Sequence, residues 1–272
     1  MINRLTKDKK GLFVINFVKK HQTIQSIIWI GIIVILWELT SELQLTNKYL
    51  LPPFSNVCKE MYRQIVEEKF ILQICNSFMM ILAGFSVSVL LAVISVILCN
   101  YSAIVRSFFR TISVILTPLP GVAIMPIIIM FFGIKETSMI ILMIHSVMWP
   151  LIINIMGGIS SIKKEYCDFA SNIELSKVVM VKDIYFFALM PSVISGARIG
   201  WGRAWRALIS AEMVFGMIGD LGGIGYFIYT NRAFGNMTRV MVGVVSVVII
   251  GIFVESVFFG ILEKMTIKKW GL

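Results

Sequence analysis

Long stretches without a charged side chain are the feature that most constrains what this chain can fold into. Residues 71–105, 111–134 and 137–162 contain no Asp, Glu, Lys or Arg. A helix of about 20 apolar residues crosses the hydrocarbon core of a bilayer, so each stretch is long enough to span a membrane. Of all 272 residues, 58% are hydrophobic and 15% are charged. Soluble domains have about 25% charged residues, so this composition excludes a soluble globular, disordered or coiled-coil protein.

The pattern predicts an all-α polytopic membrane protein with six transmembrane helices. These helices are expected over residues 24–43, 71–98, 111–134, 137–162, 184–214 and 240–262. Together they would form a single transmembrane domain over residues 24–265. Residues 1–23 and 266–272 are then N-terminal and C-terminal tails, and an even number of spans places both on the same side.

The distribution of positive charge predicts which side that is. Fifteen Lys and Arg residues lie in the two tails, the turn between the second and third helices and the loop at 161–183, against seven in the other loops. Because Lys and Arg are enriched in cytoplasmic loops, both tails and the 161–183 loop are expected in the cytoplasm of a cell-membrane protein. The net charge of +10 therefore indicates orientation in a lipid bilayer rather than binding to nucleic acid.

Two segments outside the membrane are long enough to fold. In the outer one, Pro52 and Pro53 should end the first helix, and Ser55 is expected to cap a short helix that runs to about Glu68. The inner one, residues 161–183, alternates charged and apolar residues at helical spacing. This pattern predicts one or two short amphipathic helices with an apolar face for a partner.

The chain lacks the motifs of nucleotide, metal and hydrolase chemistry. It contains no GxxxxGK[ST], HExxH or GxSxG sequence, and no paired carboxylate cluster. The few Cys and His residues lack metal-ligand spacing, which predicts ordinary thiols, no metal and no cofactor in this chain. They are Cys58, Cys75, Cys99, Cys167, His21 and His145. We therefore expect a protein that is not an enzyme, and any ATP would have to be bound by another chain.

The expected helix at 184–214 is unusual because it is charged. Arg198, Trp201, Trp205 and Glu212 fall at offsets 0, 3, 7 and 14, roughly one face of a helix. Ionisable groups within membranes usually face a cavity or a partner chain, which makes these four residues candidates for the wall of a translocation path, Glu212 above all. An alternative stays open for Arg198 and Arg203, whose side chains would instead snorkel to the lipid headgroups.

Proline and glycine residues, which distort or end helices, supply further candidates for the translocation path, for a turn and for helix packing. Pro120, with Pro118 and Pro126, removes backbone donors from the third expected helix, and bent helices often line cavities in transporters; a kink needed only for packing is the alternative. The stretch that contains Gly222, Gly223 and Gly225 is expected to form a tight outer turn between the fifth and sixth helices. The GxxxG spacing of Gly196 and Gly200 would let another helix approach closely.

Three other polar residues of the expected spans have simpler explanations. His145 stands alone on an apolar helix, where a hydrogen-bonded packing role is the expectation. Glu38 follows Trp37 at a helix end, which suits the membrane interface. A structural ion pair between Arg206 and Glu255 is possible on sequence grounds and is left undecided.

Residues 168–198, DFASNIELSKVVMVKDIYFFALMPSVISGAR, resemble the EAA loop of ABC importer permeases. That loop has the pattern EAA, three residues, Gly, nine residues, Ile, one residue and Leu-Pro. Pro191 and the Gly196–Arg198 stretch match the branch that includes nitrate, taurine and aliphatic sulfonate permeases. The motif positions of the loop fall on Asp168, Phe169, Ala170, Glu174, Ile184, Phe186 and Phe187.

Other stretches match the same branch in the same order, so the resemblance covers residues 28–270. These stretches are 37–38, 51–53, 131–134, 211–213 and 223–226. Two positions depart from the pattern, because Glu174 replaces the loop glycine and Phe187 the loop proline. At Glu174 either the chain still turns, at some strain, or two short helices merge into one.

The resemblance implies a type I importer permease that works as a homodimer, with the substrate passing between the two copies. Each 161–183 loop would dock on one of two cytoplasmic ATPase subunits, which use ATP and magnesium. An extracytoplasmic binding protein would deliver a small anionic or polar organic solute, such as a sulfonate, taurine or nitrate. A thiamine-precursor pyrimidine or another small heterocycle is the alternative within the branch.

Membrane proteins of three other classes would show different sequence features. An ion-coupled secondary carrier predicts buried acids in the first four helices and an internal repeat, yet the second to fourth expected helices have no acid in their cores. An intramembrane enzyme predicts His, Asp or Glu clustered at one depth. A structural or assembly protein would not require the amphipathic inner loop.

Overall fold

The computed structural model describes residues 24–47, 49–162, 172, 174–176, 179–219 and 221–266, which form helices and connections without any strand. The all-α fold class is thereby confirmed. The helices are Ile24–Glu42, α2 (Phe54–Val66), α3 (Phe70–Tyr101), α4 (Ala103–Leu116), α5 (Gly121–Phe132), α6 (Glu136–Ser161), the π-helical turn η1 (Met180–Tyr185), α9 (Phe186–Phe215), α10 (Ile224–Ala233), α11 (Met237–Phe253), the π-helical turn η2 (Val254–Phe258) and α12 (Phe259–Met265).

Four helices in the described part of the chain are long and apolar enough to cross a membrane. They are Ile24–Glu42, Phe70–Tyr101, Glu136–Ser161 and Met237–Met265, and the bent pair α4–α5 counts as a fifth if it forms one span. The fifth expected span, 184–214, coincides with α9, which is not among these helices and carries Arg198, Arg203, Arg206 and Glu212. The count of six therefore stays a prediction.

Helix α6 lies at the centre of the core, where it packs against α3 and α9. Glycines let these helices approach closely. A Cβ atom added at Gly196 would meet Leu151, and one added at Gly200 would meet Val147. Both α6 side chains are fully buried. The close approach expected from the GxxxG spacing is thus confirmed, and its partner is α6 of the same chain.

The prediction of one continuous third helix is wrong. Instead of one helix over 111–134, the chain forms α4 and α5, which meet at an angle of 107°. The break contains Pro118 and Pro120, neither of which has an amide hydrogen to continue the helical bonds. Pro120 has an extended backbone and is the N-cap residue of α5. The prolines therefore end one helix and start another rather than bend a single helix.

The start of α2 also differs from the prediction. The helix begins at Phe54 after the N-cap residue Pro53, and no side chain of its own caps it. Instead the Ser55 amide donates to the Glu38 carboxylate at 3.1 Å. The indole of Trp37 donates to the Pro52 carbonyl at 2.9 Å. The first helix therefore holds the N-terminal end of α2, which is a contact that the sequence alone did not predict.

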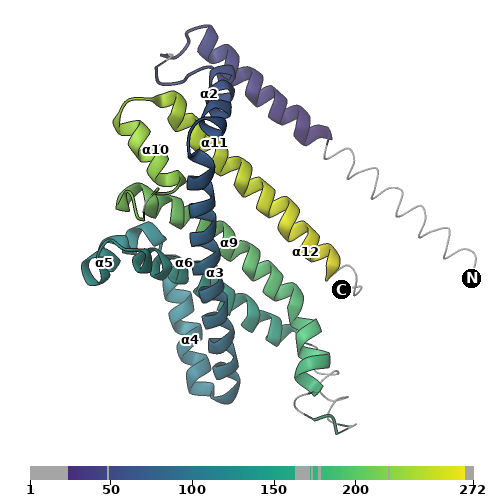
Figure 1. The fold of residues 1–272 in the computed structure, drawn as a ribbon. Helices are drawn as coiled ribbons and strands as arrows, with labels where there is room; N and C mark the ends of the chain where they lie inside the picture. The colour runs from purple at the N-terminus through teal and green to yellow at the C-terminus, as the bar shows by residue number, and fades with distance from the viewer. Residues whose placement is uncertain are drawn as a thin grey trace, which may run out of the picture.

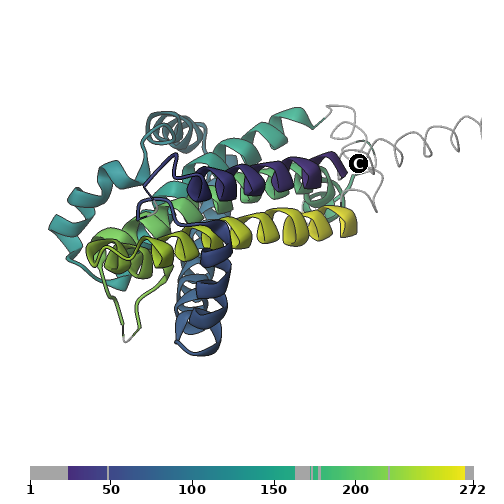
Figure 2. The same ribbon diagram turned by 90° about the horizontal axis from the view of Figure 1, so that it is seen from above.

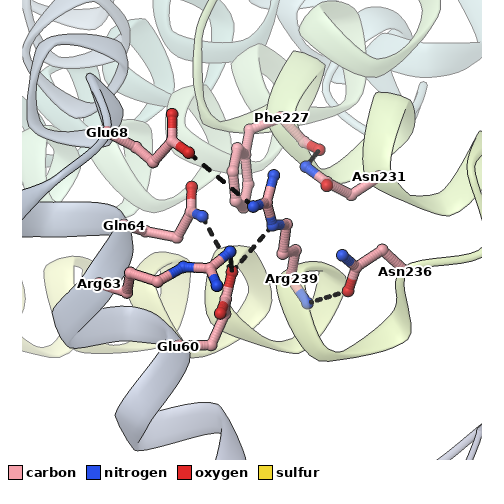
Figure 3. Close-up of polar contacts among 8 residues, drawn as sticks. All are labelled: Glu60, Arg63, Gln64, Glu68, Phe227, Asn231, Asn236 and Arg239. Carbon is pink, nitrogen blue, oxygen red and sulfur yellow. Dashed lines mark hydrogen bonds and ion pairs between the residues drawn. The ribbon is translucent and has the colours of Figure 1, made fainter.

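Arg239, at the start of α11, holds the other half of α2 (Figure 3). Its Nε atom donates to Glu60 Oε1 at 2.8 Å, and its Nη2 atom lies 3.9 Å from Glu68 Oε1. Gln64 Nε2 donates to the same Glu60 oxygen at 2.9 Å. Asn236 caps α11 by accepting the Arg239 amide hydrogen at 3.2 Å. Fixed in this way, α2 lies with α10 at one end of the molecule, while α9 starts at the other end (Figure 1).

The helix Ile24–Glu42 packs loosely, since only 6% of its most apolar window is buried. Its axis lies roughly parallel to those of α11 and α12 in both views, with the chain running in the opposite direction (Figure 1 and Figure 2). Most of its apolar surface is therefore left for lipid or for another chain.

Replacement of Arg239 tests whether its contacts hold α2 in place. In Arg239→Met the Glu60 carboxylate loses its shortest charged hydrogen bond, so the free energy of unfolding should fall by about 1–3 kcal/mol. Limited trypsin digestion of the purified protein should cleave faster after Lys59 and Arg63. Arg232→Met, which removes an exposed cation of α10, is the control and should leave the cleavage rate unchanged. An equal rate in wild type and Arg239→Met would contradict the assignment.

Candidate functional site

The candidate face of α9 points into the protein. Trp201, Trp205 and Glu212 are only 5%, 6% and 4% exposed. The ring of Trp201 packs edge-on against Phe85 of α3, with the centroids 5.4 Å apart. The indole of Trp205 donates to the Val247 carbonyl of α11 at 3.3 Å. Both tryptophans therefore join α9 to its neighbours in the conformation described.

Glu212 lies at a junction of α3, α9 and α10. Its Oε1 atom accepts a hydrogen bond from the Ser77 hydroxyl at 2.7 Å, and its Oε2 atom accepts one from the Gly225 amide at 2.7 Å. The Ser77 hydroxyl also accepts the Ile224 amide hydrogen at 2.9 Å. The first amides of a helix have no partner within the helix. Glu212 and Ser77 supply those partners to α10 from two other helices.

Two more side chains of α3 hold the chain just before α10. Gln73 Nε2 donates to the Leu221 carbonyl at 3.0 Å, and Asn76 Nδ2 donates to the Gly222 carbonyl at 2.8 Å. With Ser77 they stand at spacings of three and four, so they share one face of α3. This face was not predicted, although three polar residues at helical spacing in an apolar helix are a usable signal.

The glycines expected in the outer turn occupy the tightest part of this junction. Gly222 has a φ of +66°, which L-residues rarely adopt. A Cβ atom at Gly223 would overlap the Glu212 carboxylate and the Ser77 hydroxyl, and one at Gly225 would overlap the Ile209 carbonyl oxygen. The chain does turn here, but the expected tight connection to the last span is wrong. Helix α10 lies between α9 and α11 instead, and Ser77 and Glu212 in the interior accept hydrogen bonds from its first two amides.

The space beside Glu212 is small. A hollow of about 10 Å³ is lined by Asn76, Met139, Glu212 and Gly223 among others. One water molecule needs about that volume, so no organic solute fits there. A path role for Glu212 therefore requires that the surrounding helices separate, and it stays a prediction.

Arg198 pairs with the last helical run rather than with lipid alone. Its Nη2 atom donates to Glu263 Oε2 at 3.2 Å, and its Nε atom lies 3.4 Å from Glu255 Oε1. The guanidinium carbon is 5.7 Å from the ring centroid of Phe259. These three partners recur every four residues along η2 and α12 and so share a face. The Arg206–Glu255 pair, which the sequence left undecided, does not form in the described conformation, because Glu255 pairs with Arg198.

The break between α4 and α5 is held by polar side chains of α6 and α9. Arg203 Nη1 donates to the Thr117 carbonyl at 2.9 Å, and His145 Nε2 lies 3.3 Å from the Leu119 carbonyl. Trp149 Nε1 donates to His145 Nδ1 at 3.3 Å, which leaves Nε2 as the nitrogen that carries hydrogen. The expected packing role of His145 is confirmed, and carbonyls freed by the break find partners.

The inner loop is described only in part. Asp168, Phe169 and Ala170 lie outside the described residues. Glu174 has a φ of +52° and lies in a turn, so of the two possibilities the chain turns here as it would at glycine. Further on, Ile184 belongs to η1, and Phe187 is the second residue of α9.

Removal of the Glu212 carboxylate tests the junction. Glu212→Ala should leave the Gly225 amide without its partner and lower the free energy of unfolding by about 2–3 kcal/mol. Hydrogen–deuterium exchange of residues 221–226 should accelerate in the purified protein. Glu67→Ala, which removes an exposed carboxylate at the C-terminal end of α2, is the control. Unchanged exchange in Glu212→Ala would show that the carboxylate does not hold α10.

Comparison with known proteins agrees with this architecture. Residues 84–268 match the family described as binding-protein-dependent transport system inner membrane component. The chain is similar to the nitrate import permease protein of Synechocystis sp., with 24% identity over 93% of this chain and 92% of the relative. It is also similar to the putative aliphatic sulfonates transport permease protein of Bacillus subtilis, with 23% identity over 92% and 89%.

A third relative is the taurine transport system permease protein of Escherichia coli, with 23% identity over 90% of each chain. These relatives are transport permeases, not enzymes, and the family is a component of membranes. The match covers more than half of the chain. The chain therefore belongs to the family of binding-protein-dependent transport system inner membrane components, as an ABC importer permease of the nitrate, sulfonate and taurine type.

Proposed function

We propose that two copies of this chain form the path by which an ATP-driven importer takes up a small anionic or polar solute. A binding protein would deliver the solute from outside, and two cytoplasmic ATPase subunits would supply ATP and magnesium chemistry. Both termini and the 161–183 loop would then be cytoplasmic. The relatives named for nitrate, aliphatic sulfonates and taurine support an oxyanion as the substrate.

The observation that carries this proposal is the course of α9. This single helix of 30 residues follows the inner loop through η1 and is about 45 Å long. Along its length it contacts the last helical run through Arg198, the α4–α5 break through Arg203 and the α10 junction through Glu212. A movement of the loop would therefore be transmitted to every element that could open or close a path.

The exposed face of α9 adds a candidate for the path itself. Arg206 is exposed and forms no ion pair with any described residue, whereas Arg198 faces two carboxylates. An unpaired cation within a span is costly against lipid, so it is expected to face a water-filled cavity or a partner chain. In a homodimer, Arg206 would face the second copy and attract an anion. Arg198, Trp201, Trp205, Glu212 and Pro120 remain path candidates in a more open conformation.

Replacement of the inner loop tests the coupling to an ATPase. If residues 163–179 are exchanged for a flexible Gly/Ser segment of equal length, the purified permease should no longer retain the ATPase subunits. Glu174→Gly is the matched control, because it relieves about 1 kcal/mol of backbone strain and should keep the subunits bound. Retention of the ATPase subunits by the loop-replaced protein would contradict the coupling role.

Neutralisation of Arg206 tests the substrate class. In vesicles that contain the full transporter and its binding protein, Arg206→Gln should lower uptake of labelled nitrate or taurine roughly tenfold, equivalent to about 1.4 kcal/mol. Arg206→Lys should restore part of it, and Arg232→Gln should have no effect. If wild type transports only a neutral heterocycle, the heterocycle alternative holds; if Arg206→Gln transports anions normally, the path lies elsewhere.

A further inference from the structure

A polar hollow lies between α2 and the start of α11. These two segments lie at the end of the molecule that carries α10 (Figure 1). Its volume is about 520 Å³, and its lining residues are Asn56, Lys59, Glu60, Arg63, Asn236 and Thr238. Sites for small organic ligands are lined mostly by apolar side chains. None of these six side chains is a large apolar one, so the hollow suits a hydrated polar group and offers nothing to an acyl chain.

The hollow presents positive charge. The only acid in its lining, Glu60, already accepts hydrogen bonds from Arg239, Gln64 and Arg63 at 2.8, 2.9 and 3.2 Å, all on Oε1 (Figure 3). Its charge is therefore compensated within the cluster. Lys59 is exposed and forms no ion pair with any described residue, and the Arg63 side chain is 48% exposed. Lys59 and the exposed part of the Arg63 guanidinium, whose Nη2 atom already bonds Glu60, can thus receive an incoming carboxylate.

The hollow is also preformed. Glu38 and Trp37 fix the N-terminal end of α2, and Arg239 fixes the turn that contains Glu60. A surface that is already ordered loses little entropy when a partner binds. Tyr62 lies next to Arg63 and three residues after Lys59, and it is 70% exposed. Tyrosine and arginine are enriched at protein–protein contacts.

We propose that this hollow is the docking site for the soluble protein that delivers the substrate, and that it receives a carboxylate side chain of that protein between Lys59 and Arg63. Tyr62 supplies the apolar edge of the contact. This inference rests on the proposed function, because it needs a delivering protein and places α2 outside the cell. Charge complementarity selects an acidic partner surface, and the polar lining argues against a lipid.

The test uses the permease–ATPase complex in lipid nanodiscs and the binding protein that supports uptake by it. ATP hydrolysis is measured against the concentration of binding protein at several salt concentrations. The double variant Lys59→Gln with Arg63→Gln should raise the half-maximal concentration about tenfold and flatten its salt dependence, with the maximal rate unchanged. Tyr62→Ala should also raise it but keep the salt dependence. Arg232→Gln, the matched control at the same end, should behave as wild type.

Three results would overturn the docking site while leaving the proposed function intact. The double variant could give an unchanged half-maximal concentration, or Arg232→Gln could show the same loss, which would indicate only general attraction by charge. The effect could also vanish in nanodiscs without anionic lipid, which would assign Lys59 and Arg63 to headgroups. If no binding protein stimulates the wild-type complex, the proposed function fails and the docking site fails with it. If the binding protein stimulates the wild-type complex and the double variant with the same half-maximal concentration, only the docking site is contradicted.

Discussion

The structure depends on the placement of one carboxylate in the protein interior. Glu212 is 4% exposed, and both of its oxygens accept short hydrogen bonds, from Ser77 and from the Gly225 amide. A buried charge is stable only when such partners are present. Here the partners belong to α3 and α10, so one interaction orients three helices. It also explains why glycine stands at 223 and 225, where any Cβ atom would displace the carboxylate or the backbone of α9.

The same principle governs the other irregular parts of the chain. The break between α4 and α5 frees carbonyl groups, and Arg203 and His145 take up those of Thr117 and Leu119. In a membrane such groups have no water to bind, so irregular backbone survives only where side chains satisfy it. Three charged residues of α9 thus hold neighbouring segments. A helix that fixes so many contacts is suited to move them together, as the proposed coupling to an ATPase would require.

Particular residues show how far prediction from sequence reached. The helices Phe70–Tyr101 and Glu136–Ser161 begin and end within three residues of their predicted bounds, because a long uncharged apolar stretch can satisfy its backbone in a membrane only as a helix. The third helix was wrong because Pro118 and Pro120 act together as a stop and a start. Glu212 was singled out correctly as a special residue, but its partner Ser77 is 135 residues away. No local pattern relates two such positions.

The sequence by itself determined that this protein is a helical membrane protein, and its ordered motifs indicated the importer family that the comparisons establish. Those properties follow from hydrophobicity and local spacing, which are written along the chain. Only the tertiary structure decided which polar groups meet: Arg198 with Glu255 and Glu263, Arg239 with Glu60, and Glu212 with the start of α10. Hydrogen bonds and ion pairs act over about 3 Å, so they depend on how distant helices pack, and packing is a property of the whole chain.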